Sequence, residues 1–180
     1  MANGTLKVEN IQTSSGSGTI TLGQSGETVV FGSGVTRKEN QPAFAAYLSS
    51  DQNITDDTWT KIQINTETLD TDDCYDNSTN YRFTPTVAGK YLVYYGVTGV
   101  GSASNVVNVN GAIYKNGSNV NGGSLIFNSN QFGGSVSVNE IIDFNGTTDY
   151  VEFYLKIDMG SGTPRADANF NGPRSTHAGA

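Results

Sequence analysis

Residues 83–95 read Phe-Thr-Pro-Thr-Val-Ala-Gly-Lys-Tyr-Leu-Val-Tyr-Tyr, and this stretch decides the fold class. Its first half carries a proline and a glycine, which are turn formers. Its second half continues to Val97 as a run of aromatic and β-branched residues, the composition that favours strands. We therefore expect a turn followed by a strand over Tyr91–Val97, and the absence of polar residues predicts that this strand is buried on both faces.

Further short strands are predicted on both sides of this run. Trp59–Ile64 alternates with period two, as a half-buried strand does. Other short apolar runs occupy residues 42–48, 106–109, 113–115, 124–127, 134–138 and 150–157. Asn-Gly pairs, which are strong signals for two-residue hairpin turns, stand at 110–111, 116–117, 121–122 and 145–146. About eight to ten short strands joined by tight turns indicate an all-β sandwich or jelly roll.

The composition agrees with this fold class and excludes several partners. The 180 residues include 22 Gly but only 4 Pro, and the net charge is −7. An acidic chain gains nothing by neutralising phosphates, so we expect neither nucleic-acid binding nor attraction to an anionic membrane surface. No apolar run approaches the roughly 20 residues that a membrane span requires, so membrane insertion is not expected.

The compartment is predicted from the first residues and the cysteine count. Met1–Val8 lacks the charged and apolar regions of a secretory signal peptide. The single Cys74 excludes an internal disulfide. These features predict a protein that is made and folded in a cytoplasm.

Residues 1–36 differ from the rest of the sequence. Ile11, Ile20 and Val29 recur nine residues apart, and Gly/Ser turns separate them. Short strands at a fixed period favour a stacked β arrangement. A segment this small has too little apolar surface to fold alone, so it would pack against copies of itself or against another protein. The alternative interpretation is a flexible Gly/Ser linker.

Beyond residue 41, the sequence resembles a known family. Pro-Ala-Phe-Ala-Ala-Tyr at 42–47 resembles the first strand of the complement component 1q globular head and of the tumour-necrosis-factor-like trimeric jelly rolls. The family's central pattern is matched as Ile64-x5-Asp70-x4-Tyr75-x7-Phe83-x5-Gly89-x-Tyr91-x-Val93-x-Tyr95. Three further segments resemble its later strands and hairpin, namely 114–117, 149–153 and 169–172.

The resemblance implies a homotrimer whose jelly-roll head spans residues 42–172, followed by a C-terminal tail at 173–180. Three departures from the family pattern concern Ile64 and Val93, which replace aromatics, one extra residue before Phe83, and Pro173, which would cut the last strand short. The residues implied in the trimer or subunit core are Phe83, Tyr91, Val93, Tyr94, Tyr95, Val151 and Phe153.

The first residues carry a second resemblance. Leu-Lys-Val-Glu-Asn-Ile-Gln-Thr at 6–13 is similar to the opening of marine-bacteriophage virion structural proteins. It implies that residues 1–36 form a stalk that anchors the protein to other virion proteins, that 37–41 is a linker, and that the protein is located in the virion. The implied anchor residues are Leu6, Val8, Ile11, Ile20 and Leu22.

The inventory of catalytic residues predicts that the protein is not an enzyme. His177 is the single histidine and lies in the expected tail, so no histidine-based triad or zinc site is available. Cys74 has no histidine to activate it.

No cofactor is predicted, except that calcium is a possible ligand of one acidic segment. The acidic segment containing Glu67 also carries Asp70, Asp72, Asp73 and Asp76. Its carboxylates are either calcium ligands or a solvated acidic loop.

The function predicted from these observations is that of a bacteriophage fibre or appendage subunit with a head for host adhesion. Its ligand would be a host-surface glycan or protein, contacted by loops near residues 49–58, 99–105 and 128–133. The alternative is a capsid decoration or tail adaptor protein with a purely structural role.

Overall fold

The computed structural model describes residues 41–170 and 172–180, with the isolated residues 11, 28 and 33. The chain divides after Glu39, and the unit Asn40–Ala180 holds every strand given below. Almost all of the predicted stalk and linker lies outside the described residues, and so do the anchor residues Leu6, Val8, Ile20 and Leu22. Ile11 is described and exposed.

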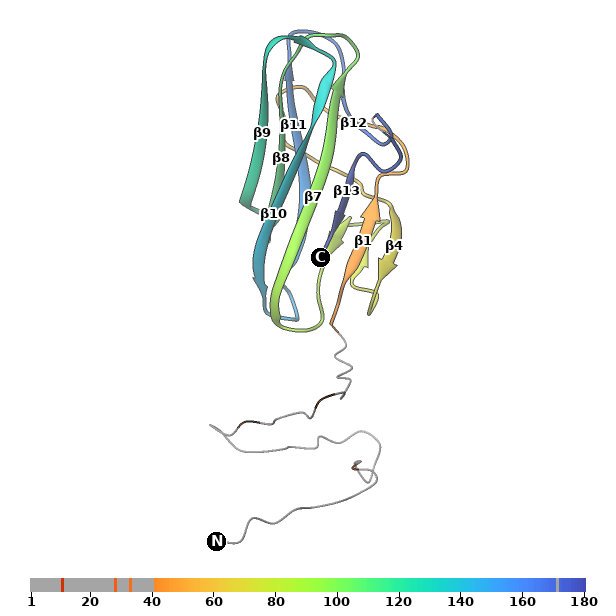
Figure 1. Cartoon of the computed structure of the whole chain (residues 1–180), viewed down its shortest axis with the longest axis vertical. Coiled ribbons are helices and arrows are strands. Elements are labelled where there is room, and N and C mark those ends of the chain that lie inside the picture. The colour runs from red at the N-terminus through yellow and green to blue at the C-terminus, as the bar shows by residue number, and fades with distance from the viewer. Residues whose placement is uncertain (1–10, 12–27, 29–32, 34–40, 171) are drawn as a thin grey trace. The chain divides into compact units, whose positions relative to one another are not determined.

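The strands of the second unit form two sheets, and its long strands run beside one another (Figure 1). The first, called the β7 sheet here, has the order β2 (Gln52–Asn53), β12 (Pro164–Asp167), β7 (Gly89–Gly101), β13 (His177–Gly179), β1 (Phe44–Tyr47) and β4 (Thr66–Asp70), with β10 (Gly133–Phe144) also paired to β7. The second, the β8 sheet, has the order β5 (Tyr75–Asp76), β6 (Arg82–Phe83), β11 (Val151–Met159), β8 (Val106–Lys115) and β9 (Ser118–Gln131), with β3 (Thr60–Lys61) also paired to β11. The predicted all-β sandwich is confirmed, and the described part of the chain contains no helix that could cross a membrane.

An aromatic cluster fills the space between the two sheets. The ring of Phe44 stacks on Tyr75 at 4.4 Å and on Phe83 at 4.8 Å. Tyr91 and Phe144 pack against Phe83 edge to face, both at 5.8 Å. Ring pairs in these arrangements contribute beyond the area that they bury. The aromatic residues of the matched sequence pattern therefore pack together in the core of a single subunit.

Six of the seven residues predicted for the trimer or subunit core are buried within one chain. They are Phe83, Tyr91, Val93, Tyr95, Val151 and Phe153. Tyr94 is not buried, and neither is Leu92. The expectation that Tyr91–Val97 is buried on both faces was wrong at Leu92 and Tyr94, because successive side chains of a strand point to opposite faces and these two point away from the core. It holds from Tyr95 onward, where every residue of β7 is buried.

Two of the four Asn-Gly pairs for which turns were predicted lie in turns. Asn116 and Gly117 have φ of 51° and 78° and form the two-residue turn between β8 and β9. This is the predicted type I′ geometry, so the prediction is confirmed there. Asn145-Gly146 lies in the loop between β10 and β11.

The pairs at 110–111 and 121–122 lie inside β8 and β9, so the turn prediction was wrong for both. A Cβ atom on Gly111 would be 2.9 Å from a Val97 methyl carbon of the opposite sheet. Gly111 therefore serves close packing between the sheets, a common role of glycine within a strand.

The last residues were predicted wrongly. The resemblance placed the final strand at 169–172 and a tail at 173–180, but the final strand is β13, which pairs with both β1 and β7. Ala178 is buried, and the backbones of Phe44 and Ala180 exchange two hydrogen bonds of 3.1 and 3.0 Å. The segment His-Ala-Gly carries almost no strand signal of its own. It forms a strand because it lies between β1 and β7, and its backbone groups hydrogen-bond to both of them.

Candidate self-association face

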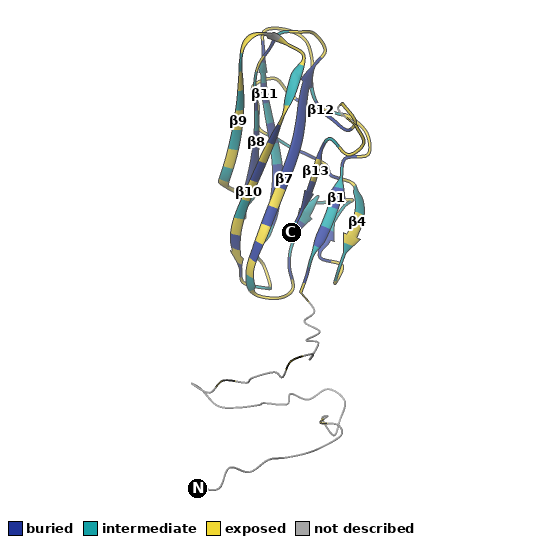
Figure 2. Ribbon diagram, viewed as in Figure 1, coloured by how far each residue is buried: buried dark blue, intermediate teal, exposed yellow. Residues whose placement is uncertain are grey.

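The face of the β7 sheet that points away from the core carries large apolar side chains. Leu92 on β7 and Ile141 on β10 are directly opposite each other and are 59% and 64% exposed. Tyr94 is the next outward residue on β7 and is 39% exposed. Figure 2 shows this alternation as yellow bands along β7 and β10. We call Leu92, Tyr94 and Ile141 the β7 face.

Beside these residues the sheet surface is flat, because the neighbouring outward positions hold small residues. The strand register places Ala45, Gly179 and Tyr94 in one row across β1, β13 and β7. A Cβ atom on Gly179 would be 2.1 Å from the Tyr94 hydroxyl oxygen. The Tyr94 ring therefore lies across Gly179, and the missing side chain there lets the ring lie flat against the sheet.

Polar groups surround the apolar centre. A pocket of about 290 Å³ next to Tyr94 is lined by Ala45, Ala46, Tyr47, Thr68, Arg174, His177 and Ala178. Within it, the Arg174 guanidinium lies 4.7 Å from the centre of the Tyr47 ring. At the other side, Lys90 forms an exposed ion pair of 3.0 Å with Asp143. An apolar centre with a polar rim is the usual anatomy of a protein–protein interface.

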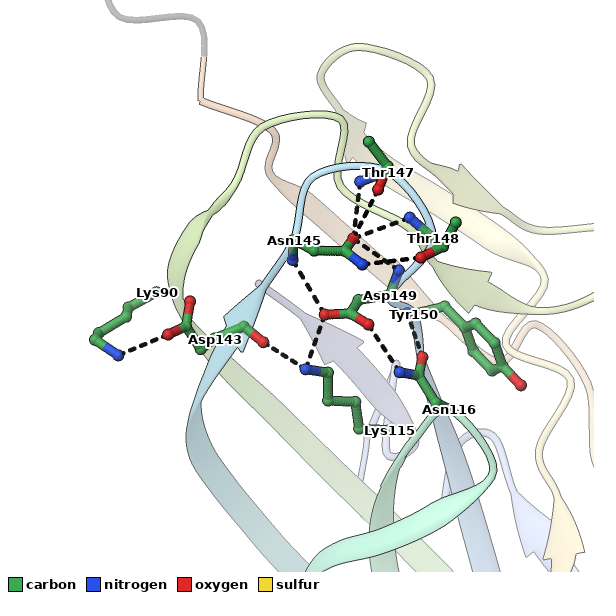
Figure 3. Close-up of polar contacts among 9 residues, drawn as sticks. All are labelled: Lys90, Lys115, Asn116, Asp143, Asn145, Thr147, Thr148, Asp149 and Tyr150. Atoms are coloured by element: carbon green, nitrogen blue, oxygen red, sulfur yellow. Dashed lines mark hydrogen bonds and ion pairs between the residues drawn. The ribbon is translucent and has the colours of Figure 1, made fainter.

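A polar network lies next to that ion pair (Figure 3). The carboxylate of Asp149 accepts a hydrogen bond of 2.8 Å from the Asn116 side chain and forms an ion pair of 2.9 Å with Lys115. These contacts hold the pKa of Asp149 below its usual value, with the Asn116 hydrogen bond as the largest cause. The side-chain oxygen of Asn145 accepts hydrogen bonds from the backbone N–H groups of Thr147, Thr148 and Asp149. The network thus ties the β8–β9 turn to the β10–β11 loop.

We expect the network to make stability depend on pH in the acid range. Because the pKa of Asp149 is lowered by folding, its contribution is present above the unfolded carboxyl pKa of about 4 and is lost as the pH falls through the folded value. Asp149→Asn should therefore lower Tm at pH 7, and the difference from the parent protein should shrink below about pH 4. Thermal unfolding followed by circular dichroism between pH 2 and 7 measures this.

Asp143→Asn is the matched control, since it removes a carboxylate from the same region. Both side chains of its ion pair with Lys90 are exposed, and exposed ion pairs contribute about 0–1 kcal/mol to stability. Its effect on Tm at pH 7 should be the smaller of the two. Equal effects of the two substitutions at every pH would contradict the role given to Asp149.

The acidic segment uses two of its carboxylates to shape its own loop. Asp70 accepts hydrogen bonds of 3.1 Å from the backbone N–H groups of Cys74 and Tyr75. Asp76 accepts from the N–H groups of residues 78–80, and these bonds, with that of Thr79 the largest cause, hold the pKa of Asp76 far below its usual value.

The other two predicted calcium ligands, Asp72 and Asp73, stand at positive φ in the same turn. No group of three or more His, Cys, Asp or Glu side chains within the described ranges is placed to hold a metal ion. The calcium hypothesis gains no support from this geometry and stays a prediction.

The two residues considered for catalysis lie in separate places. Cys74 is buried, and its thiol donates to Asp70 and to the Thr71 carbonyl. Burial, with the Asp70 carboxylate next, raises the pKa of the Cys74 thiol, so the nucleophilic thiolate does not form near neutral pH. His177 lies on β13, on the outward side of the β7 sheet beside Tyr94.

The predicted contact loops are only partly loops. Residues 99–101 belong to β7, and 128–131 belong to β9. In the third, at 49–58, Asp51 forms an ion pair of 2.9 Å with Arg165 and accepts from the Ala168 N–H group. Sequence reasoning missed Leu92 and Ile141, because the outward positions can be recognised only when the strand pairing is known.

Known structures share this fold, although no protein-family profile and no curated protein sequence matches the chain. The Eiger tumour necrosis factor from S. frugiperda aligns with a TM-score of 0.54 and 9% identity over 77% of this chain and 88% of that one. The zebrafish complement 1qA globular domain aligns with a TM-score of 0.51 and 16% identity over 77% and 95%. Murine APRIL aligns with a TM-score of 0.50 and 10% identity over 70% and 96%. The chain therefore has the jelly-roll fold of the tumour-necrosis-factor and complement 1q globular domains.

Proposed function

We propose that this protein is a bacteriophage virion protein, a homotrimeric fibre or appendage subunit whose head binds a host-surface glycan or protein. One observation supports its self-association above all others. Leu92, Tyr94 and Ile141 form a solvent-exposed apolar surface on the face of the β7 sheet that points away from the core. Complete burial of one such side chain contributes about 1.5–3 kcal/mol. Three side chains in each of three subunits are therefore sufficient to offset part of the cost of association.

The number of subunits and the virion location come from the two sequence resemblances. The region that resembles the trimeric jelly rolls is the one whose fold is shared with the tumour-necrosis-factor and complement 1q domains. The region that resembles phage virion proteins, residues 6–13, lies outside the described residues except for Ile11. It supplies the proposed attachment to other virion proteins.

A binding role fits the chemistry better than catalysis does. The described thiol is buried and held protonated, and His177 has a backbone carbonyl, that of Arg174, at 3.0 Å from its Nδ1 atom. Neither arrangement pairs a nucleophile with a base.

The test is the solution mass of the full-length protein and of a 37–180 fragment, measured by light scattering. Trimers of both, together with binding of the labelled full-length protein to bacterial cells, are the expected results. A monomer at all concentrations would overturn the assignment of the β7 face. A trimer that binds no cells but binds phage particles would instead favour the decoration or adaptor role.

A further inference from the structure

A cluster of aromatic side chains lies on the outward face of the β8 sheet, the sheet opposite the β7 face. Trp59 precedes β3, Tyr114 is on β8 and Tyr154 is on β11. The Tyr114 and Tyr154 rings lie 4.2 Å apart, and Trp59 lies 6.2 Å from Tyr114. Trp59 is 36% exposed, and both tyrosines are partly exposed. The rings are inclined to one another, Trp59 by 62° to Tyr114 and Tyr114 by 33° to Tyr154. Together they form one aromatic cluster that reaches solvent, which we call the platform.

A partly buried ion pair lies beside this platform. Glu152 is directly opposite Tyr114 and is buried, and its carboxylate lies 3.0 Å from the Lys61 ammonium. The same carboxylate accepts a hydrogen bond of 3.3 Å from the Tyr154 hydroxyl. Burial, followed by the Glu152 charge, raises the pKa of Tyr154 to about 12. The Tyr154 hydroxyl therefore stays protonated, and its hydrogen bond to Glu152 helps to orient the Tyr154 ring.

Hydrogen-bonding groups continue along the same face beyond the rings. Asn110 and Lys156 are directly opposite each other, and so are Asn108 and Asp158. All four side chains are partly exposed. Lys156 is paired with Asp57 at 2.7 Å, in the same way that Lys61 is paired with Glu152. The charges on this face therefore largely cancel, which disfavours a strongly charged partner.

We infer that the Trp59–Tyr114–Tyr154 platform, with the neighbouring Asn108 and Asn110, binds a neutral saccharide. The face of an aromatic ring is electronegative, and one face of a pyranose ring presents C–H groups of opposite polarity. The hydroxyls at the edge of the sugar match amide and carboxylate groups, which both accept hydrogen bonds. The inference rests on the proposed binding function, because it supplies the chemical class of the ligand and the place where it binds.

The occupant is a sugar rather than a second copy of the chain for two reasons. The directly opposed pair of exposed aliphatic side chains, Leu92 and Ile141, is on the other sheet, whereas on this face the exposed Ile126 lies opposite the polar Asn108. The rings at this site are flanked by the amides of Asn108 and Asn110, which hydrogen-bond to each other, and Asn108 also donates to Asp158. Each side-chain amide has four hydrogen-bonding positions, so the pair retains positions that sugar hydroxyls can use and that an apolar partner would only desolvate.

The chain carries its own reporter, because Trp59 is its single tryptophan. The full-length protein should be titrated with neutral oligosaccharides, namely cellohexaose, laminarihexaose, mannohexaose and chitohexaose, while the Trp59 emission is recorded. We expect a saturable change in emission with at least one of them, and protection of Trp59 from quenching by acrylamide. Tyr114→Ala should raise Kd by about tenfold or more. Removing one aromatic side chain that stacks on a nucleic-acid base weakens binding by a factor of this order.

Two further variants keep the test decisive. Asn110→Ala leaves all three rings in place and should also weaken binding, so the test survives if Tyr114→Ala does not fold. Phe132→Ala removes another exposed aromatic ring, in the β9–β10 turn at the other end of β8, and should leave Kd unchanged.

An unchanged emission with all four sugars would overturn the inference. It would also be overturned if both Tyr114→Ala and Asn110→Ala kept the Kd of the parent protein. A Trp59 emission that changes with protein concentration in the absence of sugar would also overturn it, because the platform would then be an interface between copies. Binding of the labelled protein to bacterial cells separates the two levels. If cells are bound while the sugars fail, only the saccharide site is wrong; if neither is bound, the proposed binding function fails as well.

Discussion

A chain that ends at Gly172 is expected not to fold. The deletion removes β13, which lies between β1 and β7 and is paired with both. It uncovers the backbone groups of two strands and removes the buried side chains of Thr176 and Ala178. The Thr176 hydroxyl makes two of the hydrogen bonds that are lost: it donates to the Asp167 carbonyl at 2.7 Å and accepts from the Thr98 N–H group. The loss is comparable with the whole net stability of a domain, about 5–15 kcal/mol.

Urea unfolding of the full-length and shortened chains, followed by Trp59 emission and by near-ultraviolet circular dichroism, measures this loss. His177→Ala in the full-length chain is the control, because it keeps every backbone bond of β13. An exposed side chain usually changes stability by no more than about 0.5 kcal/mol. A shortened chain that unfolds cooperatively at the midpoint of the full-length protein would show that β13 is dispensable.

The second large effect is a contrast between adjacent tyrosines. Tyr95→Asp should unfold the subunit, and Tyr94→Asp should leave it folded but separate the subunits. Tyr95 is 1% exposed, and its ring lies 5.1 Å from Phe153. Its hydroxyl is buried without a hydrogen-bond partner in the described structure. An aspartate there loses the ring contacts, which cost about 3–5 kcal/mol, and adds an unpaired buried charge.

Tyr94 points the other way, so an aspartate at position 94 remains in water as long as the chain is alone. In an assembly through the β7 face, the same carboxylate would be buried beside Leu92, which strongly opposes association. Light scattering and thermal unfolding of both variants separate the two effects, with Tyr94→Phe as the conservative control. A Tyr94→Asp protein that keeps the mass of the parent assembly would place the interface elsewhere.

Much of the fold could be predicted because its signals are local. The aromatic and β-branched run of β7 and the aromatic spacing from Tyr75 to Tyr95 indicate an all-β sandwich with an aromatic core, and both are present. The turn at Asn116-Gly117 was predicted for the same reason. Asn110-Gly111 has the same two letters but lies within β8, because the need for a small residue at Gly111 comes from Val97 on the other sheet. No local signal distinguishes the two pairs.

The candidate sites were harder to predict because their residues meet only through pairing. Leu92 and Ile141 are far apart in the sequence and face each other because of the β7–β10 register. Trp59 lies just before β3, Tyr114 is on β8 and Tyr154 is on β11, so the three form no sequence motif. The acidic segment, by contrast, is conspicuous in the sequence, yet Asp70 and Asp76 bond to their own loop.

The position of β13 bears on how this protein is made. During synthesis, β1 leaves the ribosome long before residues 177–179, which must lie between it and β7, have been translated. Pairings this distant in sequence close slowly, because the chain loses the entropy of a long loop before it gains the contacts. The same residues complete the row in which Tyr94 lies across Gly179. A nascent or interrupted polypeptide therefore lacks a finished β7 face, and in the proposed assembly only complete subunits would associate.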